Sequence, residues 1–140
     1  MHLRAVLDAN IFASALIKPS GPPGHILKIF LENQAFELIL SKPIIQEINR
    51  CLTYPKIKKY ILLTQDEIQL WLTAIELLSD TVESSLSLDI SLMDPEDEKY
   101  IVAALEGKAS TIVSGDHHLL TLGEYEGISI VTPRDFLNLL

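Results

Sequence analysis

The sequence predicts an α/β protein: a parallel sheet with helices on both of its faces. Two observations support this prediction. Short apolar runs of strand length alternate along the chain with longer segments of helical periodicity. Several of the runs are apolar throughout, such as Ala5-Val6-Leu7, as expected of strands that are covered on both faces. In sheets of this kind the ligand site lies beyond the carboxyl ends of the strands, so functional residues are sought there.

The first half of the chain is expected to contain two strands and five helices. Pro43 suits the first turn of one helix, and apolar side chains recur at helical spacing from residue 68 to residue 78. The prolines and glycines of residues 19–24 predict a mobile loop between two helices. The expected strands cover residues 4–8 and 36–40, and the expected helices cover residues 10–17, 26–31, 41–53, 55–63 and 64–78.

The second half is expected to alternate strands with helices in the same way. Gly107 closes a clear helix, and the serine-rich residues 84–92 predict a loop before it. The expected strands cover residues 81–85, 111–114 and 128–131, and the expected helices cover residues 94–107, 116–122 and 133–140. No repeat or linker interrupts the pattern, so residues 1–140 are predicted to form a single domain.

Composition excludes several classes of protein. The chain has 140 residues, of which 48% are hydrophobic and 21% charged, values that exclude a disordered chain. A single cysteine excludes an intrachain disulfide. The net charge of −8 argues against a protein that coats nucleic acid with positive charge. No signal peptide or membrane span is recognisable, so a cytoplasmic protein is expected.

Two aspartates follow predicted strands. Asp8 ends the first strand within Asp8-Ala9-Asn10, and Asp116 follows a later strand within Ser114-Gly115-Asp116. Aspartate is also a preferred helix N-cap, so each residue alone could simply begin the next helix. Because two different strands end in the same way, a shared site is the stronger interpretation.

Glu47 lies beside or within the apolar stripe of its predicted helix, three residues after Ile44 and four before Cys51. A carboxylate at a core edge costs several kcal/mol unless it is paired or metal-bound. The alternative is that Glu47 lies at the margin of the stripe and reaches water. Cys51 is expected to be an inert core residue.

Acids also gather in Asp94-Pro95-Glu96-Asp97-Glu98, at the start of a predicted helix. Acids and proline are favourable there without any function. Asp97, however, shares a helix face with Ile101 and Ala104, so it is the acid expected to point inward. Asp94, Glu96 and Glu98 are expected to be solvated or to support the site.

Four acids from four segments are therefore expected to meet at one end of the predicted sheet: Asp8, Glu47, Asp97 and Asp116. Unpaired, they would repel one another and raise each other's pKa. A hard divalent cation resolves this conflict, and a set of oxygen ligands selects Mg²⁺ or Mn²⁺. Such sites activate water and stabilise charge on a phosphodiester, so the sequence predicts metal-assisted phosphodiester hydrolysis.

The ordered set of Asp8-x-Asn10, Glu47, Asp97 and Ser114-Gly115-Asp116 resembles the PIN-domain ribonucleases. Three segments resemble the VapC-like branch, the toxins of toxin–antitoxin systems: Asp94-Pro95-Glu96-Asp97 through Ala104, Ile112-Val113-Ser114-Gly115-Asp116 with Leu119-Leu120, and Ile130-Val131-Thr132-Pro133 with Phe136-Leu137. The resemblance spans nearly the whole chain.

The resemblance implies a three-layer α/β/α sandwich with a central, mostly parallel sheet of about five strands. It also implies an endoribonuclease whose four acids hold one or two Mg²⁺ or Mn²⁺ ions, with Asn10, Ser114 and Asp94 in support. Since Asp97 and Glu98 are adjacent, a shift of one residue would give Glu98 the ligand role; the helix face favours Asp97. The implied partners are RNA, a cognate antitoxin and a second copy of the chain.

Other residues allow more than one interpretation. Lys56, Lys58 and Lys59 form a basic cluster that is either a solvated face or a rim that contacts RNA phosphates. His117 and His118 are adjacent, so they point apart on a helix and are expected to lie at the surface or contact RNA rather than bind metal.

Three other functions fit the predicted sheet less well. A haloacid-dehalogenase-like phosphatase needs a second aspartate where Asn10 stands, and a phosphorylated receiver domain needs a lysine where Pro133 follows the last strand. A PIN-like module that binds nucleic acid or a partner without catalysis remains an alternative.

Overall fold

The structure, a computed structural model, describes residues 3–88 and 94–140. Within these residues the sheet has six strands in the order β3-β2-β1-β4-β6-β5. The strands are β1 (Arg4–Leu7), β2 (Glu37–Ser41), β3 (Asp80–Val82), β4 (Thr111–Val113), β5 (Glu124–Tyr125) and β6 (Ile128–Val131). Neighbouring strands are parallel except for β5 and β6, which are antiparallel. The mostly parallel sheet is therefore confirmed, with six strands rather than about five.

The order of the strands reverses beside β1. The chain runs from β1 outward through β2 to β3, and then crosses to β4 on the other side of β1. Adjacent strands whose crossovers leave in opposite directions open a crevice at their carboxyl ends, where α/β proteins bind ligands. Asp8 follows β1 and Ser114 follows β4, so both residues stand at this switch point.

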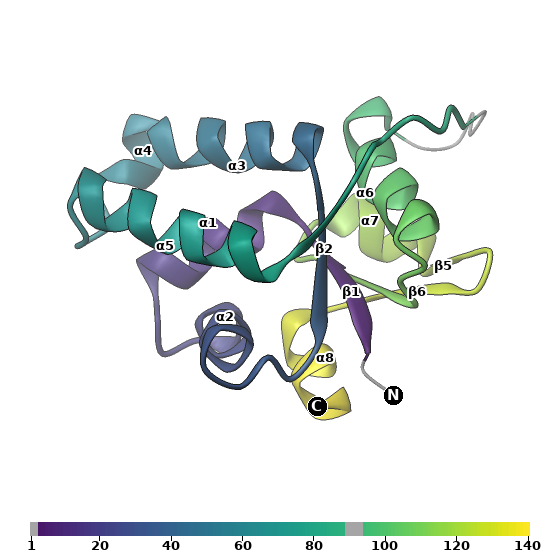
Figure 1. Cartoon of the computed structure of the whole chain (residues 1–140), viewed down its shortest axis with the longest axis horizontal. Coiled ribbons are helices and arrows are strands. Elements are labelled where there is room, and N and C mark those ends of the chain that lie inside the picture. The colour runs from purple at the N-terminus through teal and green to yellow at the C-terminus, as the bar shows by residue number, and fades with distance from the viewer. Residues whose placement is uncertain (1–2, 89–93) are drawn as a thin grey trace.

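Helices flank the sheet on two sides. In Figure 1, α6 and α7 lie on one side of the strands, and α1, α2 and α5 lie on the other. The helices are α1 (Ala9–Ile17), α2 (Pro22–Asn33), α3 (Lys42–Thr53), α4 (Pro55–Lys58), α5 (Gln65–Leu78), α6 (Pro95–Glu106), α7 (His117–Leu122) and α8 (Pro133–Leu139). None of these helices is long and apolar enough to cross a membrane.

The core forms where the apolar strands meet the helices. The side chains of β1 at residues 5–7 and of β2 at residues 38–40 are almost fully buried, as the continuous apolar runs predict. Phe36 packs between Phe30 of α2 and Phe136 of α8, with ring centroids 5.3 and 5.0 Å away. These contacts fix α2 and α8 to the start of β2.

Side-chain caps begin several helices, among them α3 and α6, which carry Glu47 and Asp97. The hydroxyl of Ser41 caps α3, and the carboxylate of Asp94 accepts the N–H of Glu96 at the start of α6. Thr64 and Glu67 form a reciprocal capping box at the start of α5. These local bonds set where each helix leaves the sheet.

The predicted loop of residues 19–24 is wrong in its second half. Helix α2 begins at Pro22. Proline is compatible with this position because the N–H groups of the first turn have no partner within the helix. Gly24 is buried in this turn, where a Cβ atom would lie 2.1 Å from the carbonyl oxygen of Pro19. Residues 22–24 therefore form the first turn of a packed helix instead of the expected loop.

Other predicted boundaries are wrong by several residues. The helix expected over residues 55–63 ends at Lys58, and the strand expected over residues 81–85 covers Asp80–Val82. Strand β5 was not predicted. In the predicted loop of residues 84–92, residues 84–88 have no helix or strand, and residues 89–92 lie outside the described part of the chain.

Candidate active site

Asp8 and Asp116 are joined through the hydroxyl of Ser114. The Ser114 hydroxyl donates to Asp8 Oδ2 at 2.8 Å and accepts the N–H of Asp116 at 2.9 Å. Asp8 Oδ1 accepts the N–H of Asn10 at 3.1 Å, so Asp8 also caps α1. Burial raises the pKa of Asp8, and these hydrogen bonds oppose that shift. The Ser114 hydroxyl thus links the Asp8 carboxylate to the backbone of Asp116, whose own carboxylate accepts the N–H of His118 at 3.0 Å.

Asp97 points inward from the first turn of α6, as its helix face predicted. The residue is 8% exposed. Its pKa is raised to about 6, first by burial and then by the negative charges of Asp116, Asp94 and Asp8. These acids from three segments therefore lie near enough to repel one another.

Glu47 reaches the same region from α3. Lys99 forms an ion pair with its carboxylate, with Nζ 3.0 Å from Oε2, and the hydroxyl of Tyr100 donates a hydrogen bond to the same oxygen. The charge of Glu47 adds to the forces that raise the pKa of Asp8. Glu47 therefore lies near Asp8, but a cation from α6 already balances its charge.

The neighbouring polar residues have separate contacts. Glu98 accepts the backbone N–H of Leu88 at 3.1 Å, so this carboxylate anchors the segment before α6. Asn10 is exposed, and its side-chain oxygen accepts a long contact from Cys51 Sγ at 3.7 Å. Cys51 is buried, in agreement with the expected core position.

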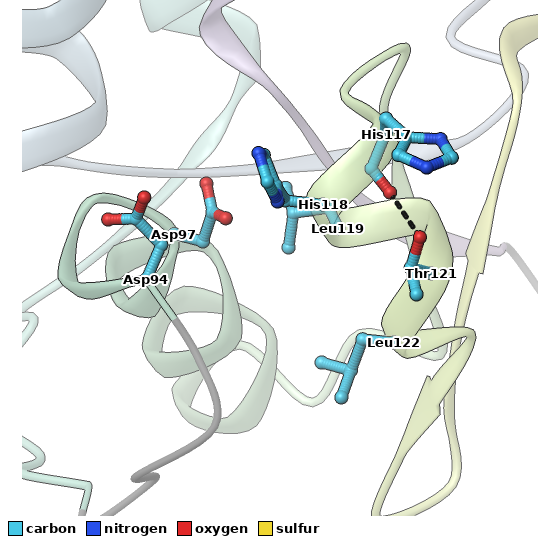
Figure 2. A pocket seen from close by; sticks show the side chains of 7 residues that line it. All are labelled: Asp94, Asp97, His117, His118, Leu119, Thr121 and Leu122. Carbon is cyan, nitrogen blue, oxygen red and sulfur yellow. Dashed lines mark hydrogen bonds between the residues drawn. The ribbon is translucent and has the colours of Figure 1, made fainter.

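A cavity of about 520 Å³ opens between the start of α6 and α7, beside Asp97. Asp94, His118, Leu119 and Leu122 contribute to its wall. Figure 2 shows the ring of His118 directed toward the carboxylates of α6, whereas the ring of His117 points away from them. The two histidines thus point apart, as adjacent residues on a helix should.

The chemistry of these carboxylates suits a hard cation, but the distances between them do not. The buried carboxylates of Asp8 and Asp97, with Asp116, offer oxygen ligands and carry repulsion that a divalent cation would relieve. Across residues 3–88 and 94–140, however, no group of three or more His, Cys, Asp or Glu side chains is placed to hold a metal ion. The carboxylates would have to move closer together to surround a cation.

The structure does not bring the basic cluster to the carboxylates. Lys56, Lys58 and Lys59 are exposed on and just after α4, which lies at the far end of α3 from the sheet (Figure 1). Lys59 lies over the ring of Tyr60, 5.1 Å from its centroid.

Sequence reasoning missed the partners of Glu47. Tyr100 is a large, fully buried residue on α6, and its oxygen accepts the N–H of Ala9 at 3.1 Å while it donates to Glu47. Lys99 supplies the neighbouring cation. Lys99 and Tyr100 directly follow the acids of residues 94–98 on the same helix. This proximity was the sequence signal that could have identified them.

Comparison with known proteins agrees with this geometry. A family model described as PIN domain matches residues 4–118. An uncharacterized protein of Methanocaldococcus jannaschii is 33% identical over 146 residues, which cover 98% of this chain and 91% of that relative. A chain of VapBC2 from Rickettsia felis, in a crystal structure with a DNA fragment from their promoter, has a TM-score of 0.60 at 14% identity and covers 93% of this chain and 98% of that chain. The chain belongs to the PIN domain family, as the order of its acids predicted.

Proposed function

We propose that this PIN domain is an endoribonuclease that depends on Mg²⁺ or Mn²⁺. The observation that carries the proposal is that Asp8 and Asp116 stand at the switch point of the sheet, near enough to the buried Asp97 for their charges to raise its pKa. Proteins of this family are generally nucleases. Repelling carboxylates are costly to a fold, so their presence at the usual ligand position favours a role in binding a cation.

Asp8, Asp97 and Asp116 are the proposed metal ligands, with Glu47 as the fourth. A divalent cation bound there would supply an activated water and stabilise charge on the phosphodiester. The Ser114 hydroxyl bonds to the Asp8 carboxylate and to the backbone N–H of Asp116, which keeps the Asp8 carboxylate beside the segment that carries Asp116. Lys99 holds Glu47 on the site side of α3 while no cation is bound. Asn10 and Asp94 are proposed as supporting polar groups at the edge.

Asp97 rather than Glu98 is the proposed ligand on α6. Asp97 is buried toward the other acids, whereas Glu98 accepts a backbone N–H from Leu88. This difference gives a matched pair of variants one residue apart. Glu98→Gln keeps an acceptor for the N–H of Leu88, and Asp97→Asn keeps the size of the side chain while it removes the charge.

The test is cleavage of end-labelled RNA, with DNA of the same sequence as a second substrate, in Mg²⁺, Mn²⁺ or EDTA. The wild type should cut RNA only with metal. Asp97→Asn should lower the rate at least 100-fold, and Glu98→Gln should retain most of it. If the two variants behave in the opposite way, the ligand is Glu98. A wild type that binds RNA with metal but never cuts it would instead be a silent binding module, which the spacing of the acids also allows.

We also propose that the protein is the toxin of a toxin–antitoxin pair and works as a homodimer or higher homo-oligomer. The support for the pair is the likeness in fold to a chain of VapBC2. A short open reading frame beside this gene would supply the antitoxin to test. Its product should bind the chain and stop cleavage when the two are expressed together. Light scattering of the purified chain tests the oligomer.

A further inference from the structure

Side chains of three chemical kinds form most of the cavity between α6 and α7, beside Thr121 and beside His117, whose ring points away from the carboxylates (Figure 2). The imidazole of His118 is exposed and faces the cavity, the side chains of Leu119 and Leu122 form an apolar surface, and the carboxylates of Asp94 and Asp97 stand opposite the histidine (Figure 2). The volume of about 520 Å³ lies within the usual range for small-molecule sites. A ligand that fits all three walls has a flat apolar face and a polar edge.

We propose that this cavity binds a nucleobase of the RNA strand, and that it prefers a base with an exocyclic amino group. The inference rests on the proposed ribonuclease function and adds a specificity pocket to it. Proteins that read single-stranded RNA stack bases on aromatic side chains, histidine included, and bind their edges with hydrogen bonds. His118 offers the stacking surface, and the leucines complete the apolar side.

The carboxylate of Asp94 decides which edge is favoured. One of its oxygens accepts the N–H of Glu96 at 2.9 Å, which fixes the side chain at the start of α6. A carboxylate accepts hydrogen bonds from an amino group such as that of cytosine. Uracil presents carbonyl oxygens in place of the amino group, and an anionic wall repels them. Cytosine, adenine and guanine, which each carry an exocyclic amino group, should therefore bind better than uracil.

The position of the cavity links the base to the bond that is cut. Asp97 borders the cavity and also carries the repulsion of Asp116 and Asp8. A base in the cavity would therefore belong to a nucleotide beside the scissile phosphate. A second metal ion is a weaker occupant, because the described residues include no group of three ligand side chains placed to hold one.

Binding of short oligonucleotides tests the pocket without cleavage. The probes are fluorescent six-residue oligo-C, oligo-A and oligo-U, measured by anisotropy in Ca²⁺, on the assumption that Ca²⁺ supports binding with little hydrolysis. The wild type should bind oligo-C and oligo-A at least fivefold more tightly than oligo-U. His118→Ala should weaken binding of oligo-C at least fivefold, the usual loss on removing a stacking ring.

Two further variants separate the pocket from a general effect of charge or folding. Asp94→Asn keeps a good helix cap but should remove most of the preference for oligo-C over oligo-U. His25→Ala removes an exposed imidazole from α2, on the other side of the sheet, and should bind every probe as the wild type does. Titration with cytidine 5′-monophosphate should shift the NMR signals of the His118 ring and leave those of the His25 ring unchanged.

The outcomes distinguish this inference from the proposed function. If the wild type cuts RNA but His118→Ala and Asp94→Asn bind all three probes as the wild type does, the pocket is wrong and the ribonuclease stands. If the wild type neither binds the probes in Ca²⁺ nor cuts RNA in Mg²⁺ or Mn²⁺, both are wrong. Binding with the expected preference but without cleavage would support the pocket in a protein that has lost catalysis.

Discussion

The hydroxyl of Tyr100 on α6 donates a hydrogen bond to the carboxylate of Glu47 on α3. The phenol oxygen of Tyr100 also accepts the backbone N–H of Ala9, the residue directly after Asp8. One buried phenol therefore connects the start of α1, the middle of α3 and the first turns of α6. Burial and the charge of Asp8 raise the pKa of Tyr100, so the phenol stays protonated and keeps its proton for Glu47.

Tyr100→Phe should destabilise the protein and reduce its activity. The variant leaves the N–H of Ala9 without its partner in a buried position, which costs about 1–3 kcal/mol. Glu47 also loses the bond that orients it, so metal-dependent cleavage should fall at least tenfold. Urea unfolding and the RNA assay measure the two effects. Tyr60→Phe, at an exposed tyrosine, is the control and should change neither.

Asp97→Asn should stabilise the metal-free protein, and by an amount that grows with pH. The pKa of Asp97 is raised from 3.8 to about 6 on folding, so the folded state holds a proton that the unfolded state releases between these values. Stability of the wild type therefore falls as pH rises through this window and stays lower above it.

The asparagine variant escapes this loss because it carries no charge. At pH 8 in EDTA it should be more stable than the wild type by about 1–2 kcal/mol, after allowance for solvent screening. Near pH 4 the difference should shrink toward zero. Urea unfolding at both pH values measures it, with Asp66→Asn at an exposed site as control. An equal gain at both pH values would mean that packing, not charge, explains the effect.

Divalent metal should stabilise the folded protein. A cation at 100 times its dissociation constant adds about 2.7 kcal/mol, which raises the melting temperature of a chain this size by roughly 5–10 °C. The measurement is thermal unfolding in Mn²⁺ against NaCl of equal ionic strength. Asp8→Asn should lose the increase, and Asp135→Asn on α8 should keep it. An increase that survives in Asp8→Asn would place the cation elsewhere.

Replacing Lys56, Lys58 and Lys59 with alanine should weaken RNA binding and reduce its dependence on salt. Each lost phosphate contact to a single strand lowers the slope of log affinity against log salt by about 0.7. The position of the cut should not change, because phosphate contacts hold the strand without performing the chemistry. The matched control replaces Lys18, Lys28 and Lys108, which are also exposed and give the same net charge. If both triple variants lose affinity equally, the cluster acts only through overall charge.

The parallel sheet could be predicted because several of its strands are continuous apolar runs in the sequence. Strand β5 could not, since it has only two residues and lies between Gly123 and Gly127, both at positive φ, with no apolar run to mark it. The start of α2 was missed for a related reason. Two prolines and a glycine usually mark a break, and only the packing of Gly24 against Pro19 shows that here they begin a helix.

The candidate site likewise contains features that could be predicted from local sequence and features that could not. The inward direction of Asp97 follows from helical spacing alone, and the structure agrees. The bond from Tyr100 to Glu47 joins residues 53 positions apart, and no local pattern encodes it. The contact of Glu98 could not be predicted either, because its bond to the backbone N–H of Leu88 depends on how the segment before α6 packs against that helix.

Helix α6 holds Asp97 and the partners of Glu47 near its start, and near its end Glu106 accepts the backbone N–H groups of Ser84, Ser85 and Leu86. An inserted residue turns the rest of an α-helix by about 100°. A single insertion between Asp97 and Glu106 would therefore rotate these two residues relative to each other about the helix axis. If one of them kept its contacts, the other would point away from its own. The number of residues in this stretch is thus as constrained as their identity, so length variation among relatives should fall outside it, in places such as the turn between β5 and β6.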